Sequence, residues 1–229
     1  MTGGAGEADR PLPVELARLL HDLRGPLNSA VMHLEVLKRT VAEDPTAADS
    51  LRTVLQQLVR LSEMLPAAFN VAALEPGRLD VFDLRTLVER ARDARGLGGV
   101  RVAPGTWPRV RGDEALLVMA IGELLANAVE ATPPGRSSPE ASGASSPDGD
   151  GVLAVRDWGT GLRTTNPKLL IRLLHSTKTG HAGLGLVIAE RVARVHGGTL
   201  AFEALADGAR VTLRLPSGDA QASQPSRRR

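Results

Sequence analysis

The stretch from His21 to Leu37, HDLRGPLNSAVMHLEVL, decides the fold class of the first part of this 229-residue chain. It lies in a longer run of apolar residues spaced alternately by four and by three. The members of this run are Leu16, Leu20, Leu23, Leu27, Ala30, Leu34, Leu37 and Val41. Such spacing places the apolar side chains along one side of a helix, as in a coiled-coil seam. The sequence therefore predicts an amphipathic helix that packs along this seam.

A second run with the same spacing follows a Glu43-Asp44-Pro45-Thr46 break, at which a helix must stop and a new one can begin. The second run consists of Leu51, Val54, Leu58, Leu61, Leu65, Ala68 and Ala72. The two runs predict a helical hairpin. Burying one leucine contributes about 1.5–3 kcal/mol, but two helices leave both seams half exposed. We therefore expect a second copy to cover them in a homodimeric four-helix bundle.

Composition limits the remaining possibilities. Apolar residues make up 42% of the chain, which is enough for a globular core. Lys and Arg outnumber Asp and Glu by only 28 to 26, so nucleic-acid binding is unsupported. The chain has no cysteine, no signal-peptide pattern in its opening residues and no apolar run of membrane-spanning length. We expect a cytoplasmic protein without a membrane span.

The pattern changes near residue 79, where we expect a second domain of mixed helices and strands. Helices are predicted over residues 84–95, 113–132 and 183–196, and strands over 100–102, 109–110, 152–157, 199–203 and 209–215. The Pro/Gly/Ser-rich stretch 133–150 is predicted to be a low-complexity loop. The expected divisions are a disordered tail 1–10, the hairpin 11–78, the second domain 79–216 and a disordered basic tail 217–229. The fold class is therefore α+β.

His21 is the first candidate for a residue with a chemical role. The register of Leu20 and Leu23 places it beside the seam, where solvent can reach it. A neutral imidazole has a nitrogen lone pair that can attack phosphorus. Asp22 could hold the other ring N–H, although neighbouring helix residues point about 100° apart. Taken alone, the His-Asp pair also fits an ordinary surface histidine.

The context of His21 resembles the phospho-acceptor box of bacterial two-component histidine kinases, in which an acidic residue follows the histidine and a proline lies five positions beyond it. Here these are Asp22 and Pro26. In the second domain, Glu123-Leu-Leu-Ala-Asn127 resembles the N box of the ATPase fold that these kinases share. The resemblance implies that Asn127 binds Mg²⁺ through its oxygen and that Glu123 assists near the reacting phosphate.

Two glycine-containing motifs follow in the family's order. Asp157-Trp-Gly159-Thr-Gly161 resembles the G1 box, in which the carboxylate accepts from the exocyclic amine of adenine and the glycines turn the backbone beside the base. The segment 177–186, TKTGHAGLGL, resembles the G2 box, where backbone amides at a helix start face phosphate. The resemblance assigns nucleotide binding there to Thr177, Lys178, Gly183, Leu184 and Gly185.

The resemblance implies a dimeric hairpin followed by an α/β sandwich ATP-binding domain of the GHKL (Bergerat) type. The implied function is an autokinase that uses ATP and Mg²⁺ to phosphorylate His21. The phosphoryl group would then pass to an aspartate of a response regulator in a phosphorelay. Because only residues 1–10 precede the first expected helix, we expect the input to come through a separate sensory protein, through the dimer surfaces, or not at all.

The sequence departs from the family at three places. Gly25 lies one turn after His21, where kinases that also dephosphorylate their partner have Thr or Asn to orient water, so weak or absent phosphatase activity is expected. Leu174 and His175 replace the two phenylalanines usual in the lid over the nucleotide. The low-complexity stretch 133–150 occupies the place of a strand and hairpin, so the sheet is expected to lack a strand.

Two other functions are compatible with parts of this pattern. A phosphorelay scaffold or pseudokinase would bind a receiver domain through the bundle while its ATP site has degenerated, and the altered lid favours that hypothesis. A protein-serine kinase or ATPase would use the same nucleotide fold, but it leaves the sequence around His21 unexplained. Acid-labile rather than acid-stable protein phosphate would separate the histidine kinase from the serine kinase.

Overall fold

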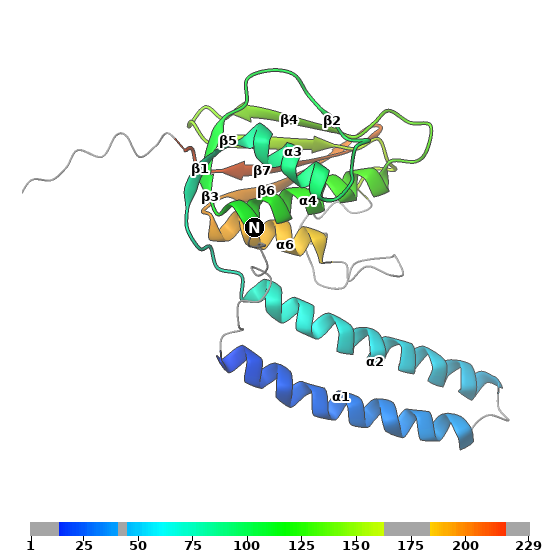
Figure 1. The fold of residues 1–229 in the computed structure, drawn as a ribbon. Helices are drawn as coiled ribbons and strands as arrows, with labels where there is room; N and C mark the ends of the chain where they lie inside the picture. The colour runs from blue at the N-terminus through cyan, green and yellow to red at the C-terminus, as the bar shows by residue number, and fades with distance from the viewer. Residues whose placement is uncertain (1–13, 41–44, 163–183, 219–229) are drawn as a thin grey trace, which may run out of the picture. The chain divides into compact units, whose positions relative to one another are not determined.

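The computed structural model describes residues 14–40, 45–162 and 184–218 of the chain (Figure 1). These residues form two compact units, of which the first ends at Ala73 and the second begins at Leu74. The first unit is entirely helical and the second combines helices with a mixed sheet, so the α+β class is confirmed. None of the described helices combines the length and the apolar composition of a membrane-spanning segment.

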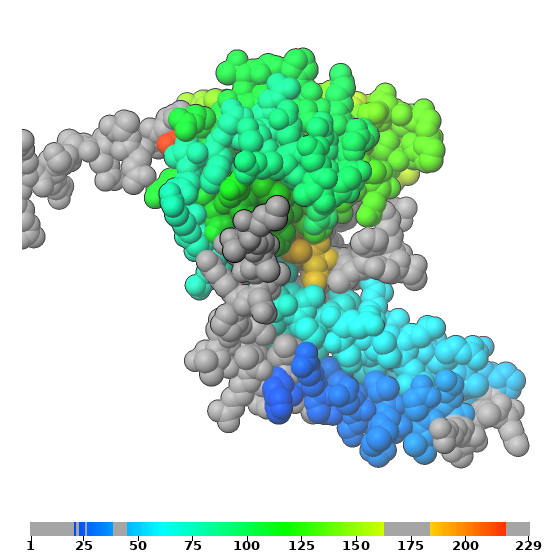
Figure 2. Space-filling view, in the orientation of Figure 1, coloured from blue at the N-terminus to red at the C-terminus, as the bar shows by residue number. Residues whose placement is uncertain are grey.

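The first unit is the predicted helical hairpin. Helix α1 spans Val14–Thr40 and helix α2 spans Pro45–Ala72. The two helices pack side by side along their length, as the blue and cyan surfaces in Figure 2 show. Proline has no N–H to donate and suits the first turn of a helix, which explains why α2 begins at Pro45. The break residues 41–44 lie outside the described part.

The residues that are buried within the hairpin differ from those of the predicted seam. The buried side chains of α2 are Leu55, Met64 and Val71, and none of them belongs to the predicted run. Val54 and Leu61, which do belong to it, keep 45% and 37% of their surface exposed. On α1, Leu23, Leu27 and Leu34 are only half-buried. One hairpin therefore leaves much of its apolar seam uncovered.

The second unit contains two sheets. The larger sheet has the strand order β2-β4-β5-β7-β6, and β2 and β4 are its parallel pair. Its strands are β2 Arg101–Val102, β4 Glu140–Ser145, β5 Gly151–Arg156, β6 Thr199–Leu205 and β7 Gly208–Leu215. The smaller sheet pairs β1 Asp80–Asp83 antiparallel with β3 Arg109–Gly112. The predicted strands over residues 100–102, 109–110, 152–157, 199–203 and 209–215 are all present.

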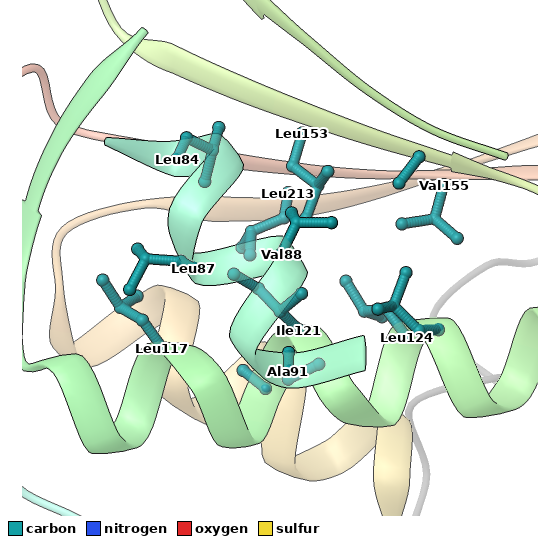
Figure 3. Packing of buried hydrophobic residues seen from close by; sticks show 14 of the residues in the cluster. Leu84, Leu87, Val88, Ala91, Leu117, Ile121, Leu124, Leu153, Val155 and Leu213 are labelled. Atoms are coloured by element: carbon teal, nitrogen blue, oxygen red, sulfur yellow. The ribbon is translucent and has the colours of Figure 1, made fainter. Parts of the chain in front are cut away.

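Three helices pack on one face of the larger sheet. They are α3 Leu84–Ala94, α4 Glu114–Ala131 and α6 Gly185–Val195. Figure 3 shows the core between them, in which Leu87 and Val88 of α3 and Ile121 of α4 belong to one buried cluster with Leu153 and Leu213 of the sheet. Aspartates cap two of these helices, because the Asp83 side chain accepts from the Thr86 N–H and that of Asp113 from the Leu116 N–H.

The expectation of a loop over residues 133–150 is wrong, and so is the expectation that the sheet lacks a strand. Strand β4 lies inside this stretch and pairs with β5 from Glu140 to Ser145. Its small residues fit because Gly143 leaves room for the buried Trp107: a Cβ at Gly143 would lie 2.3 Å from the indole. The strand gains its backbone partners from β2 and β5, which composition alone does not reveal.

The turn between β4 and β5 is held by a side chain of β7, the strand that pairs with β5. Arg214 of β7 donates to Asp148 at 2.6 Å and to Asp150 at 2.7 Å. The hydrogen bonds to Asp148 and then to Asp150 raise the pKa of the Arg214 guanidinium. Arg214 thus adds a side-chain link to the backbone pairing of β4 that already ties this Pro/Gly/Ser-rich stretch to the domain.

Two expected boundaries also differ from the structure. Residues 74–78 belong to the second unit, where the Leu74 carbonyl accepts from Arg191 at 3.0 Å and the Gly77 N–H donates to Asp113 at 2.7 Å. At the other end, Ser217 bridges to Val110 and the Gly218 N–H donates to the Arg109 carbonyl, so the ordered chain continues past 216. The tails 1–10 and 219–229 lie outside the described residues.

Candidate nucleotide site and phospho-acceptor helix

Helix α4 carries the first two candidate site residues, Glu123 and Asn127. They are four positions apart and therefore lie on one side of the helix. The opposite side of α4 is anchored in the core by Leu117, Ile121 and Leu125, which are completely buried. This anchoring fixes the rotation of the helix, so the carboxylate and the amide are presented together at the edge of the core.

The N-terminus of α6 lies against both of these side chains. A Cβ at Gly185 would lie 2.6 Å from Glu123 Oε2 and 3.4 Å from Asn127 Nδ2. Only glycine at position 185 allows the start of α6 to lie so close to the side chains of Glu123 and Asn127. The structure thus brings together Glu123, Asn127 and Gly185, which are far apart in sequence, beside the exposed amides of a helix N-terminus that favours anions.

Asp157 lies at the end of β5 and is buried. One of its carboxylate oxygens, Oδ1, accepts from the backbone N–H of Gly159 at 2.8 Å and of Ala209 at 3.2 Å. These bonds fix the orientation of the carboxylate. The other oxygen remains chemically able to accept from an exocyclic amine such as that of adenine.

The glycines around Asp157 are required by close backbone approach. A Cβ at Gly159 would lie 2.4 Å from the Ala131 carbonyl oxygen, and Gly161 has a left-handed φ of 76°. Gly208, the first residue of β7 after the turn from β6, has a φ of 132°, and a Cβ there would lie 2.1 Å from the Asp157 carbonyl oxygen. We did not identify Gly208 from the sequence, although its position in the Asp207-Gly208 turn of the closing hairpin is a signal for it.

The structure describes only some of the remaining candidate site residues. His21 lies on α1 and is exposed. Asp22 lies on the same helix, but the structure describes only its backbone. Leu184 is buried just before α6. Thr177, Lys178 and Gly183, together with the lid positions Leu174 and His175, lie outside the described residues.

The residues present fit a nucleotide with a hard cation. Asn127 Nδ2 is buried and has no hydrogen-bond partner among the described residues, which is unfavourable unless a ligand supplies one. Within the same residues, no cluster of three or more His, Asp or Glu side chains could hold a metal by itself. A cation held by the amide oxygen and by phosphate oxygens would suit this arrangement, since Mg²⁺ takes oxygen ligands and is usually held by few protein groups together with substrate phosphates and water.

The chain combines a helical hairpin with a domain that has a mixed sheet and a glycine-lined helix start. This is the arrangement expected of an ATPase domain joined to a phospho-acceptor helix pair. Comparison with known families agrees: residues 15–75 match the His Kinase A (phospho-acceptor) domain. Residues 112–219 match the histidine kinase-, DNA gyrase B- and HSP90-like ATPase family. The chain belongs to the bacterial two-component sensor histidine kinases.

Individual relatives are distant. The chain is similar to sporulation kinase B of Bacillus subtilis, with 26% identity over 210 residues, covering 88% of this chain and 49% of the relative. It is also similar to the sensor-like histidine kinase SenX3 of Mycobacterium tuberculosis, with 27% identity over 223 residues, covering 88% of this chain and 53% of the relative. The chain therefore spans about half the length of these curated relatives.

Solved structures share the fold. A crystal structure of full-length ShkA in complex with AMPPNP superimposes with a TM-score of 0.57 at 22% identity. The similarity covers 90% of this chain and 46% of that protein. Both units of the fold therefore occur together in a known structure.

Proposed function

We propose that this protein is an ATP-dependent protein-histidine autokinase that phosphorylates His21 and passes the phosphoryl group to an aspartate of a response regulator. The observation that carries the proposal is the convergence of Glu123, Asn127 and Gly185 at a helix N-terminus, in a chain that also presents an exposed histidine on α1. The family matches over both units support it. We propose that the reaction takes place in the cytoplasm.

In the proposed site each residue has a distinct task. Asp157 accepts from the adenine amine, and the amides at the start of α6 face the phosphates. Asn127 holds Mg²⁺, which supplies charge neutralisation and orientation to the triphosphate. Glu123 lies beside the reacting phosphate. The role of Thr177, Lys178, Gly183 and Leu184 in phosphate binding is proposed from the motif that they form.

His21 is the nucleophile. Its neutral imidazole nitrogen forms a bond to the γ-phosphorus while the bond from that phosphorus to the bridging oxygen breaks, and ADP leaves. Asp22 orients the ring through its other nitrogen. In the next step the phosphorus–nitrogen bond breaks as an aspartate of the receiver domain attacks, which regenerates His21.

A homodimer is part of the proposal. Val54 and Leu61 of the seam keep a large exposed fraction in one hairpin, and exposed apolar side chains gathered along a helix favour a protein partner. A second hairpin with the same seam would cover them in a four-helix bundle. The response regulator and a separate sensory protein are the other partners that we propose.

The decisive experiment incubates the purified protein with γ-labelled ATP and Mg²⁺, beside the variant His21→Gln. Label that is acid-labile and base-stable, and that disappears in the variant, is the expected result. His33→Gln is the matched control, because His33 is another exposed histidine on α1 and should keep full labelling. Labelling that survives in His21→Gln would contradict the proposal.

The altered lid sequence at Leu174 and His175 favours one second candidate, a phosphorelay scaffold with a degenerate ATP site. The same experiment distinguishes it. A scaffold would show no labelled histidine under any Mg²⁺ concentration, yet would still bind a receiver domain through the hairpin.

A further inference from the structure

An ion pair links α3 to the candidate catalytic carboxylate. Arg95, at the C-terminal cap of α3, donates through Nη2 to Oε1 of Glu123 on α4. The side chain of Glu123 is 20% exposed and that of Arg95 is 35% exposed, so the pair is partly shielded from water. These residues are 28 positions apart in sequence and meet because α3 packs on α4.

The backbone of α4 makes room for this arginine. Gly122, next to Glu123, is buried in the interior of the helix, where glycine is unfavourable compared with alanine. A Cβ at Gly122 would lie 2.6 Å from Nε and 2.9 Å from Cδ of Arg95. Gly122 therefore allows the arginine side chain to lie flat against α4 and reach the carboxylate.

The two oxygens of Glu123 consequently face different groups. Oε1 accepts from Arg95, whereas Oε2 would lie 2.6 Å from a Cβ at Gly185, at the start of α6. A carboxylate without a cationic partner at this position would repel phosphate bound to the amides of α6, because charges that are partly shielded from water interact more strongly than in bulk water. Arg95 offsets this negative charge and also fixes which oxygen faces α6.

We propose that Arg95 is a positioning residue of the nucleotide site: it orients Glu123 toward the N-terminus of α6 and reduces the repulsion between that carboxylate and the triphosphate. This inference rests on the proposed function. Arg95 acts through Glu123 and does not itself contact the nucleotide. Its effect therefore depends on the charge of Glu123.

The test measures Mg-ATP affinity by calorimetry with the full-length chain in a His21→Gln background, in which phosphoryl transfer cannot interfere. Arg95→Gln is expected to weaken binding about fivefold, the size typical of coupling in a partly exposed pair. Arg95→Lys keeps the charge and is expected to lose less. Arg85→Gln is the matched control, because Arg85 forms an exposed pair with Glu89 on the same helix and should leave affinity unchanged.

A double-mutant cycle separates positioning from a general structural role. When Glu123→Gln has already removed the carboxylate charge, Arg95→Gln is expected to cause no further loss of affinity. An equal loss in both backgrounds, an affinity unchanged by Arg95→Gln, or an equal loss for Arg95→Lys and Arg95→Gln would overturn the inference. Failure of the proposed function looks different: either the His21→Gln parent does not bind Mg-ATP at all, or the unaltered protein binds it without forming a labelled histidine.

Discussion

Asp157 is the residue at which we propose that a single hydrogen bond decides ligand choice. Its Oδ1 already serves the backbone N–H groups of Gly159 and Ala209, so a substitution that removes both oxygens would also disturb the loop. Asp157→Asn keeps an acceptor for these two N–H groups and replaces the other oxygen with a donor. This variant therefore separates adenine recognition from loop structure.

We expect Asp157→Asn to bind Mg-ATP more weakly by about 1.5–3 kcal/mol, or roughly ten- to a hundredfold, because a donor would then face the adenine amine. Calorimetric titration with ATP measures the loss. The melting temperature of the variant should stay close to that of the parent, which checks that the loop is intact. Unchanged affinity would remove Asp157 from the adenine site.

Gly25 is the residue at which a missing side chain is expected to limit activity. Apart from its two chain neighbours and the backbone of its own helix, no described atom lies within 4 Å of a Cβ built there, so there is room for the side chain of an asparagine to begin. We expect Gly25→Asn to accelerate dephosphorylation of a phosphorylated receiver domain at least about tenfold, because the amide can orient water next to His21. Loss of aspartyl phosphate after ATP removal is the measurement, and Ser29→Asn, one turn further along α1, is the control.

At the scale of the secondary-structure elements, the start of α4 is held by hydrogen bonds from three different segments. Asp113 is buried; its Oδ1 accepts from the Leu116 N–H, its Oδ2 accepts from the Gly77 N–H, and its own N–H donates to Nε2 of His196. His196 Nδ1 lies 2.7 Å from the Val192 carbonyl oxygen, and a carbonyl only accepts, so Nδ1 is the ring nitrogen that donates. One aspartate thus joins α4, the end of α6 and the segment that follows the hairpin.

Asp113→Ala should destabilise the second unit by about 2–3 kcal/mol, because it removes the cap and leaves a second N–H without its acceptor. Asp83→Ala is the matched comparison: Asp83 caps α3 through one bond at an exposed position and should cost about 1 kcal/mol. Both tryptophans, Trp107 and Trp158, lie in this unit, so their fluorescence during denaturant unfolding reports its stability. Equal losses in the two variants would show that the bond to Gly77 contributes nothing.

At the scale of the whole molecule, the uncovered seam of the hairpin determines the expected assembly. The double variant Val54→Glu with Leu61→Glu places two charges on that seam and is expected to convert the dimer to a monomer, since a buried like-charge cluster costs several kcal/mol. Light scattering measures the mass. Gln56→Glu adds the same kind of charge at an exposed position off the seam and should leave the dimer intact. A native protein that is already monomeric would refute the dimer.

Most helices and strands could be predicted from local patterns in the sequence. Alternating apolar spacings predicted α1 and α2, and the helices and strands around Glu123, Asn127, Asp157 and Gly185 were also predicted, because each has its own periodicity or turn residues. Strand β4 was missed since its residues are small and polar and resemble a loop. It becomes a strand only because β2 and β5 satisfy its backbone groups.

The sequence by itself determined the helical hairpin, the α+β class and the resemblance to histidine kinases, because periodicity and motif spacing are properties of short segments. Only the tertiary structure decided that residues 74–78 join the second unit and that Gly208 supports Asp157. It also brought Arg95 to Glu123. These contacts join residues distant in the chain, and packing of helices on the sheet, which no local pattern encodes, determines which of them meet.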